Sequence, residues 1–172
     1  KTHEWMDAAL RSVGISFLGY CLWELLALKQ WILQNRNISS GPGVWGWSLG
    51  GELALLWGAL DPDVRATCIS AFLSSYQDSL LAEPHCGCGY VHGLAKEWTQ
   101  GEILGLIAPR PVCVQSFRED IFPLPAAERS VNEARKAYVA AGNPQGLTHQ
   151  IFEGGHEVNV SAGVEWFLRV TA

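Results

Sequence analysis

The pattern of apolar and polar positions predicts a chain that alternates between helices and strands. Residues 17–35 show helical spacing, with apolar residues on one side and Glu24, Lys29 and Gln34 on the other. The apolar stripe of this helix comprises Leu18, Cys21, Leu22, Leu25, Leu28 and Ile32. Apolar runs rich in β-branched and aromatic residues predict strands at 44–47, 66–73, 111–116 and 147–153.

Helical segments separate and follow these strands. They are predicted at 52–60, at 126–141 and around 166–168. This alternation is typical of an α/β fold with a mostly parallel sheet flanked by helices. Residues 74–105 show no sustained period and are expected to be a cap-like insertion that shapes specificity. The whole chain, 1–172, is predicted to be one domain.

Residues Gly46-Trp47-Ser48-Leu49-Gly50 join the first predicted strand to an apolar helix, as in a nucleophile elbow. Ser48 is the candidate nucleophile. A strand that turns directly into a helix leaves little room, and Gly46 and Gly50 are expected to provide it. The backbone N–H of Leu49, at the start of the helix, is the candidate oxyanion donor. An ordinary glycine-rich turn is the alternative, but the apolar elements on both sides favour the elbow. Trp47 is a candidate substrate-binding residue, with packing as its alternative role.

A serine nucleophile needs a base, and the base needs an orienting acid. Asp120 lies in the loop after the strand at 111–116 and is the candidate acid, with its neighbour Glu119 as a rival. His156 follows the last predicted strand after two glycines and is the candidate base. His149 lies inside that strand and is interpreted as a structural residue. The order serine, acid, histidine is that of the α/β-hydrolases.

Four segments of the chain carry a family resemblance, namely 46–51, 107–111, 118–123 and 153–157. Through them the chain from about Ser12 onward resembles the carboxyl-terminal two-thirds of the α/β-hydrolase superfamily, in the branch of dienelactone hydrolases and acetyl xylan esterases. The resemblance implies the α/β-hydrolase fold and ester hydrolysis through an acyl-enzyme. It also implies that Ser48, Asp120 and His156 form a catalytic triad.

The start of the chain departs from this family. A complete domain has about eight strands and places the serine after the fifth, whereas only Val13–Ile15 have any strand character before residue 17. The fold is therefore expected to be truncated at the N-terminus, without the loop that normally provides the second oxyanion donor. The elbow strand would have an open edge, along which the isolated chain is expected to form a homodimer or aggregate.

The composition of the chain restricts the kinds of partner that it is expected to bind. The chain has 48% hydrophobic and 17% charged residues and a net charge of −5, which argues against nucleic acid. No stretch approaches the ~20 apolar residues of a membrane span. The expected partner is a small-molecule ester, with no cofactor. Cys21, Cys68 and Cys113 fall on apolar elements and are expected to be reduced, which favours a cytoplasmic setting.

His85-Cys86-Gly87-Cys88, with His92 nearby, forms a second group of potential ligands. One tight cluster lacks the separated second pair that is typical of structural zinc sites, so no metal is predicted. The tripeptides at 37–39 and 159–161 match glycosylation sequons, but such matches are common by chance.

Two classes of function stay open. The first is a serine carboxylesterase of small acyl or carbohydrate esters, in which His156 deprotonates Ser48 and Asp120 orients His156. The second is a catalytically silent fragment, or a subunit that completes its sheet with another chain. A serine peptidase of the prolyl-oligopeptidase type shares the order of the three residues and is a subordinate alternative.

Overall fold

The structure is a computed structural model that describes residues 2–35 and 41–171. Its centre is a parallel four-stranded sheet in the order β1-β2-β3-β4. The strands are β1 (Gly43–Trp47), β2 (Ala66–Ser70), β3 (Val112–Phe117) and β4 (Leu147–Phe152). The prediction of an α/β fold with a parallel sheet is confirmed, and each predicted strand forms within or close to its expected bounds.

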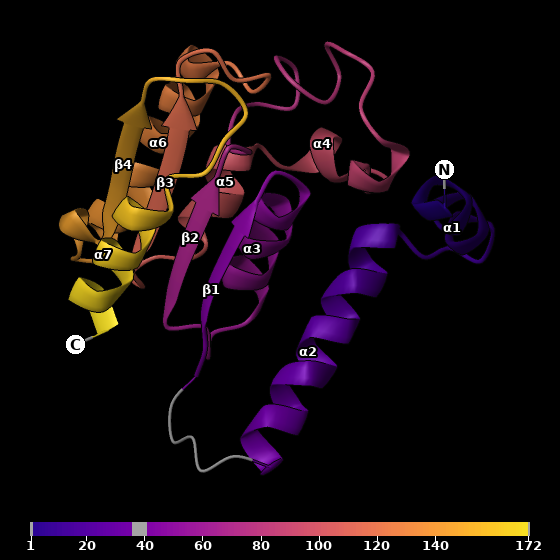
Figure 1. Cartoon of the computed structure of the whole chain (residues 1–172), viewed down its shortest axis with the longest axis horizontal. Helices are drawn as coiled ribbons and strands as arrows, with labels where there is room; N and C mark the ends of the chain where they lie inside the picture. The colour runs from indigo at the N-terminus through magenta and orange to yellow at the C-terminus, as the bar shows by residue number, and fades with distance from the viewer. Residues whose placement is uncertain (1, 36–40, 172) are drawn as a thin grey trace.

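Helices cover both faces of the sheet (Figure 1). Three lie behind it in this view, α3 (Leu49–Leu60), α5 (Gln100–Gly105) and α6 (Leu124–Ala140), and α7 (Val160–Thr171) lies in front. Successive side chains of a strand point to opposite faces. On β2, Ile69 therefore joins the larger core shared with α3, α5 and α6, whereas Cys68 joins a smaller cluster around Trp166 of α7.

Two helices precede the sheet, α1 (Thr2–Ser12) and α2 (Phe17–Asn35). Val13–Ile15 do not form a strand. The N–H groups of Val13 and Ile15 both donate to the Leu10 carbonyl oxygen at 3.0 Å, and Gly14 has a φ of +80°, so these residues end α1 in a turn. Among the described residues no single helix is long and apolar enough to cross a membrane. Only α1 and α2 together, with a 95° bend between them, reach that length and composition.

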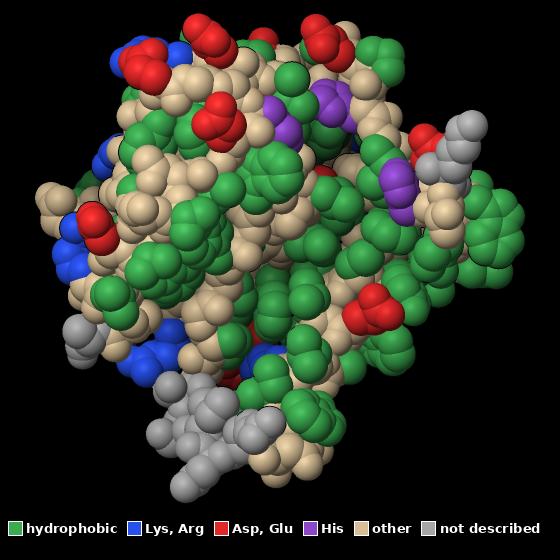
Figure 2. Space-filling model, viewed as in Figure 1, with side chains coloured by type: hydrophobic (Ala, Val, Ile, Leu, Met, Phe, Trp, Pro, Cys, Tyr) green, Lys and Arg blue, Asp and Glu red, His purple; other side chains and the backbone are tan. Residues whose placement is uncertain are grey.

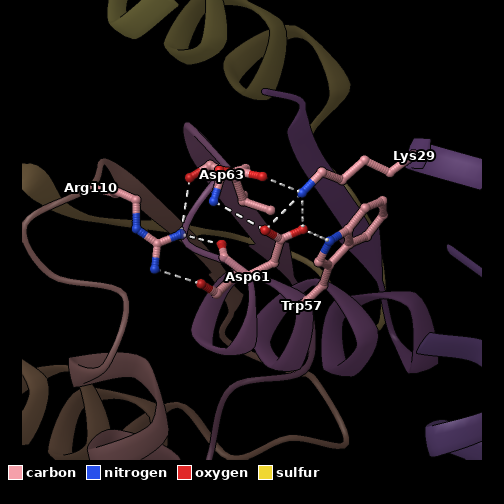
Figure 3. A network of polar contacts seen from close by, with 7 residues as sticks. Lys29, Trp57, Asp61, Asp63 and Arg110 are labelled. Atoms are coloured by element: carbon pink, nitrogen blue, oxygen red, sulfur yellow. Dashed lines mark hydrogen bonds and ion pairs between the residues drawn. The ribbon is translucent and has the colours of Figure 1, made fainter. Parts of the chain in front are cut away.

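Lys29 lies on the buried side of α2, whereas its charge predicted the polar side (Figure 3). Its Nζ donates to Asp61 Oδ2 at 2.7 Å and to Asp63 Oδ2 at 2.8 Å, and Trp57 Nε1 donates to Asp61 Oδ2 at 2.9 Å. The partners of Lys29 are 32 and 34 residues away, so helical periodicity could not reveal them. Leu28, predicted on the apolar stripe, is half-exposed instead.

The same network fixes the turn between α3 and β2. Arg110 donates to the backbone carbonyls of Gly58, Asp61 and Val64, at 2.7 to 3.0 Å (Figure 3). Burial by itself would raise the pKa of Asp61, but hydrogen bonds from Lys29, from Trp57 and from the backbone of Asp63 hold it below its ordinary value. The network therefore stabilises the end of the sheet opposite to the carboxyl ends of the strands.

The segment from Ser74 to Trp98 is largely irregular, with short helices at Gly87–Gly89 and α4 (Leu94–Glu97). The following helix, α5, belongs to the main body, because Ile103 and Leu104 are buried in the core it shares with α3 and α6. Its start is fixed by a capping box between Thr99 and Glu102. A cap role for the irregular segment stays a prediction.

The elbow strand β1 has one open edge within the described part of the chain. It pairs with β2 on one side, and no described strand lies on the other. The face between the sheet and α2 is largely hydrophobic (Figure 2). Exposed apolar side chains of α2 include Trp23, Leu26, Leu28 and Trp31. The unpaired edge of β1 and the exposed apolar side chains of α2 favour association through this edge, which remains a prediction.

Candidate active site

Ser48, Asp120 and His156 follow three different strands and meet at one edge of the sheet. Ser48 follows β1, Asp120 follows β3 and His156 follows β4. The carboxyl ends of parallel strands lie at the same edge, where open α/β sheets place their sites. His156 Nε2 lies 2.8 Å from Ser48 Oγ, and His156 Nδ1 lies 2.8 Å from Asp120 Oδ1. The structure therefore brings all three predicted site residues into hydrogen-bond contact, in an arrangement that can activate a serine hydroxyl.

Ser48 holds a backbone conformation that side-chain-bearing residues rarely adopt, with φ 58° and ψ −123°. The surrounding structure fixes this conformation. The N–H of Ser48 donates to the Ser70 carbonyl oxygen at 3.0 Å, and the Ser48 carbonyl oxygen accepts from the N–H groups of Gly51 and Glu52. The hydroxyl is thus presented at the point where β1 turns into α3, as the elbow pattern predicts.

Room for this turn comes from Gly46 and Gly51. A Cβ at Gly46 would overlap the Gly50 carbonyl oxygen, and a Cβ at Gly51 would lie 2.9 Å from Phe72 Cβ. A Cβ at Gly50 would meet open space. The prediction is right for Gly46 and wrong for Gly50, because the close approach of helix to strand occurs one residue later than the pattern suggests.

Asp120, not Glu119, is the carboxylate that reaches the histidine. The Asp120 side chain is 1% exposed, and its Oδ1 also accepts from the Phe122 N–H at 3.3 Å. Glu119 is exposed. His149, the other histidine of this region, lies 2.9 Å from Ser116 Oγ, and burial lowers its pKa. These contacts agree with the structural role predicted for His149.

Leu49 is the first residue of α3, so its N–H is one of those at the helix start that have no acceptor within the helix. This position, next to Ser48, suits the predicted oxyanion donor. Trp47 is 47% exposed, and its ring centroid lies 5.1 Å from that of His156. It is not among the described residues that line the cavity beside Ser48. A substrate-binding role for Trp47 therefore stays a prediction, and its observed contact is with the imidazole.

A cavity of about 430 Å³ opens beside Ser48, a volume typical of small-molecule sites. Its apolar walls include Phe17, Leu49, Phe72, Leu80 and Phe122. Phe122 also packs on the triad, with its ring centroid 5.8 Å from that of His156. Polar side chains in the cavity wall are few, which suits a ligand that is mostly apolar or weakly polar near the reacting serine.

Two cavity residues escaped sequence analysis, Glu52 and His3. Glu52 is only 2% exposed, although a glutamate side chain in water is charged at neutral pH. The signal that could have revealed it is a glutamate one turn after the candidate nucleophile, in an otherwise apolar helix. His3 could not be found in this way, because only the packing of α1 brings it to the site.

Cys86 and Cys88 form a disulfide in the cavity wall. His3 lies close to them, since the ligand atoms of His3, Cys86 and Cys88 all lie within 4.8 Å of one another. A metal would require thiolates, and the disulfide engages both sulfurs. The absence of a metal stays a prediction. Cys21, Cys68 and Cys113 are free thiols, and the cytoplasmic setting stays a prediction.

One of the two sequons, at 37–39, lies outside the described residues. The other begins at Asn159, whose Oδ1 accepts from the Ala162 N–H at 3.0 Å at the start of α7. Its carbonyl oxygen accepts from Gln115 Nε2 at 3.0 Å. Asn159 therefore has a structural explanation as a helix cap.

The backbone is similar to that of several solved esterases. A Bacteroides fragilis protein assigned as an acetyl xylan esterase matches with a TM-score of 0.74 and 22% identity, over 87% of this chain and 40% of that one. A glucuronoyl esterase from Solibacter usitatus matches with a TM-score of 0.71 and 14% identity, over 90% and 48%. The methylesterase BT1017 matches with a TM-score of 0.70 and 20% identity, over 91% and 36%.

This chain has the α/β-hydrolase fold. The predicted fold class is thus confirmed, and the predicted resemblance to the α/β-hydrolases extends to the backbone. No protein-family model matches the sequence, and no curated protein matches it. At these identities the similarity establishes the fold, and the chain spans less than half the length of each of the three structures. No described strand of the hydrolase fold precedes β1, in agreement with the expected truncation.

Proposed function

We propose that this chain carries the catalytic residues of a serine carboxylesterase that acts on small acyl or carbohydrate esters. The main support for the proposal is that His156 contacts both other residues. Its Nε2 lies 2.8 Å from Ser48 Oγ, and its Nδ1 lies 2.8 Å from Asp120 Oδ1. Two of the three similar structures described above are named for carbohydrate esters, acetyl xylan and glucuronoyl esters. This likeness supports a carbohydrate ester as the substrate class.

In the proposed acylation step, His156 Nε2 accepts the proton of Ser48 as its Oγ attacks the ester carbonyl carbon. The carbonyl oxygen becomes an oxyanion, which the Leu49 N–H stabilises. When the carbon–oxygen bond to the leaving alcohol breaks, the alcohol takes the proton from His156. Asp120 accepts the hydrogen bond from Nδ1–H, which keeps the imidazole in the required tautomer.

Deacylation repeats these steps with water. His156 removes a proton from a water molecule as the water oxygen attacks the acyl carbon. The bond between that carbon and Ser48 Oγ then breaks, and Oγ takes the proton back from His156. The products are the free acid and the regenerated serine. No step requires a metal or an organic cofactor.

The two alternatives receive less support. A catalytically silent fragment would not need to maintain strained backbone geometry at Ser48 together with two hydrogen bonds to His156. A peptidase would use the same three residues, but the solved structures described above are esterases. Ester hydrolysis therefore accounts for more of the observations.

The proposal is tested by turnover of p-nitrophenyl acetate, followed by acetylated xylo-oligosaccharides and a methyl ester of a uronic acid. Ser48→Ala should reduce kcat at least about 10³-fold, since removal of the nucleophile leaves only binding and oxyanion stabilisation. Ser12→Ala, at an exposed serine of α1, is the matched control and should keep wild-type activity. Wild-type turnover in Ser48→Ala would contradict the proposal.

A further inference from the structure

The cavity beside Ser48 contains one buried carboxyl group for which the triad mechanism has no use. Glu52 lies one turn into α3, and its N–H donates to the Ser48 carbonyl oxygen at 3.1 Å. Its side chain lines the same cavity as the Ser48 side chain and is 2% exposed. Glu52 therefore lines the space that an acyl group attached to Ser48 would enter.

Glu52 has one carboxyl oxygen that is without a hydrogen-bond partner among the described residues. Its Oε1 is buried and accepts or donates no hydrogen bond there. A Cβ at Gly89 would lie 3.3 Å from Oε2, so the turn at 87–89 passes near the second oxygen. Buried polar groups are nearly always hydrogen-bonded, and an unpaired one destabilises the fold. A ligand that enters the cavity could supply the missing partner.

The environment of Glu52 keeps it uncharged at neutral pH. Burial raises its pKa to about 8. No lysine or arginine is among the described residues that line the cavity, and the other titratable side chains there are His3 of α1 and His85. Tyr76 also lies near Glu52. Burial is the main cause that raises the pKa of Tyr76, and the negative charge of ionised Glu52 is the second cause. A neutral carboxyl group offers an O–H donor to its ligand.

We propose that Glu52 is a specificity-determining residue that donates a hydrogen bond to an acceptor oxygen on the acyl part of the ester. This inference rests on the proposed esterase function. The acyl part is the relevant one because it becomes attached to Ser48, on the same helix start as Glu52, whereas the alcohol leaves toward His156, which protonates it. The substrate class is therefore an ester whose acyl chain carries a further keto, hydroxyl or ether oxygen, not a plain alkyl chain.

The test compares two esters that differ in one oxygen, p-nitrophenyl levulinate and p-nitrophenyl pentanoate. The measured quantity is the ratio of their kcat/KM values. The hydrolysis of both esters requires His156 in the same protonation state, so the ionisation of His156 does not change this ratio. In the wild type the ratio should favour the keto ester about 10- to 100-fold at pH 7, since a site built around a buried donor rejects an analogue without the acceptor. Glu52→Gln keeps a neutral donor and should keep the preference, whereas Glu52→Leu should lose it.

The pH dependence separates this role from a purely structural one. As pH rises from 6.5 to 9.5, Glu52 ionises and its donor is lost, so the wild-type ratio should fall toward 1 with a midpoint near 8, while Glu52→Gln should show a constant ratio. Glu83→Gln, at an exposed glutamate, is the matched control and should follow the wild type. The wild-type and Glu52→Gln profiles decide the matter even if Glu52→Leu does not fold.

Two results would overturn the inference, and they are distinguishable. A wild-type ratio near 1 at pH 7, with Ser48-dependent turnover of both esters, would refute the role of Glu52 and leave the esterase function standing. An absence of Ser48-dependent turnover of either ester would refute the proposed function and the inference with it.

Discussion

Asp120 Oδ1 lies 2.8 Å from Nδ1 of His156, whereas the side chain of Glu119, one residue earlier, is exposed to solvent. Asp120→Asn should therefore lower kcat by about 10³–10⁴-fold, because the imidazole would lose its orienting acceptor and adopt the wrong tautomer; the serine proteases provide the precedent for this magnitude. Glu119→Gln should change kcat little. Steady-state turnover of p-nitrophenyl acetate gives kcat for both variants. A large loss of kcat in Glu119→Gln but not in Asp120→Asn would show that Asp120 is not the catalytic acid.

The elbow allows a second prediction from a pair of glycines. Gly46→Ala should prevent stable folding or soluble expression, because its Cβ would overlap the backbone of Gly50, which cannot move without displacing α3. Gly50→Ala should be tolerated, since its Cβ would meet open space. Circular dichroism and thermal unfolding compare the two variants. Equal stability of both would mean that the strand and the helix are further apart than described.

Sequence reasoning recovers what neighbouring residues determine. The strands at 44–47 and 147–153, the elbow at Ser48 and the loop positions of Asp120 and His156 all follow from local pattern and from their order along the chain. These features persist in the fold because a parallel sheet brings the carboxyl ends of its strands to one edge.

Other features depend on contacts between distant segments and escape a reading of local pattern. Lys29 is buried because Asp61 and Asp63 meet it across more than thirty residues. His3 reaches the cavity through the packing of α1, and the lack of a partner for Glu52 Oε1 depends on which side chains surround it. Periodicity contains none of this information, since it treats every charged residue as a solvent-facing one.

The buried ion pair gives a third prediction. Lys29→Met should lower the free energy of unfolding at pH 7 by about 2–3 kcal/mol, because Asp61 would remain buried without its cation. Breaking a fully enclosed ion pair costs about 3–5 kcal/mol. The expected loss is smaller here because the side chain of Asp63, the second partner of Lys29, is 66% exposed. Lys96→Met is the matched control. Lys96 is 85% exposed in its own ion pair, and its replacement should cost about 0.5 kcal/mol or less.

The pH dependence of stability distinguishes this ion pair from simple packing. The pKa of Asp61 is held below its ordinary value in the folded state, so its contribution to stability is present above about pH 4 and is lost as pH falls through the folded pKa. The wild type should therefore lose stability more steeply on acidification than Lys29→Met. Urea unfolding between pH 2.5 and 7 measures this difference, and parallel curves for the two proteins would contradict the assignment.

The open edge of β1 leads to a fourth prediction. Unpaired backbone groups beside an apolar face favour association, so the isolated chain should be a dimer or a larger species at micromolar concentration. Its turnover should be weak, because one oxyanion donor is worth on the order of 10²–10³ in rate and Leu49 is the one donor assigned among the described residues. Light scattering coupled to size exclusion, with an esterase assay on each fraction, tests both statements. A monodisperse monomer with full turnover would refute them.

Covalent labelling is the sharpest test of Ser48 as the nucleophile, because it reports an activated serine without requiring complete turnover. The wild-type chain is incubated with a fluorophosphonate probe, and intact-mass measurement and peptide mapping then locate the adduct. We expect a single adduct on Ser48, no adduct in Ser48→Ala, and strongly slowed formation in His156→Ala, which lacks the base. Equal labelling of the wild type and Ser48→Ala, or an adduct on another residue, would contradict this assignment.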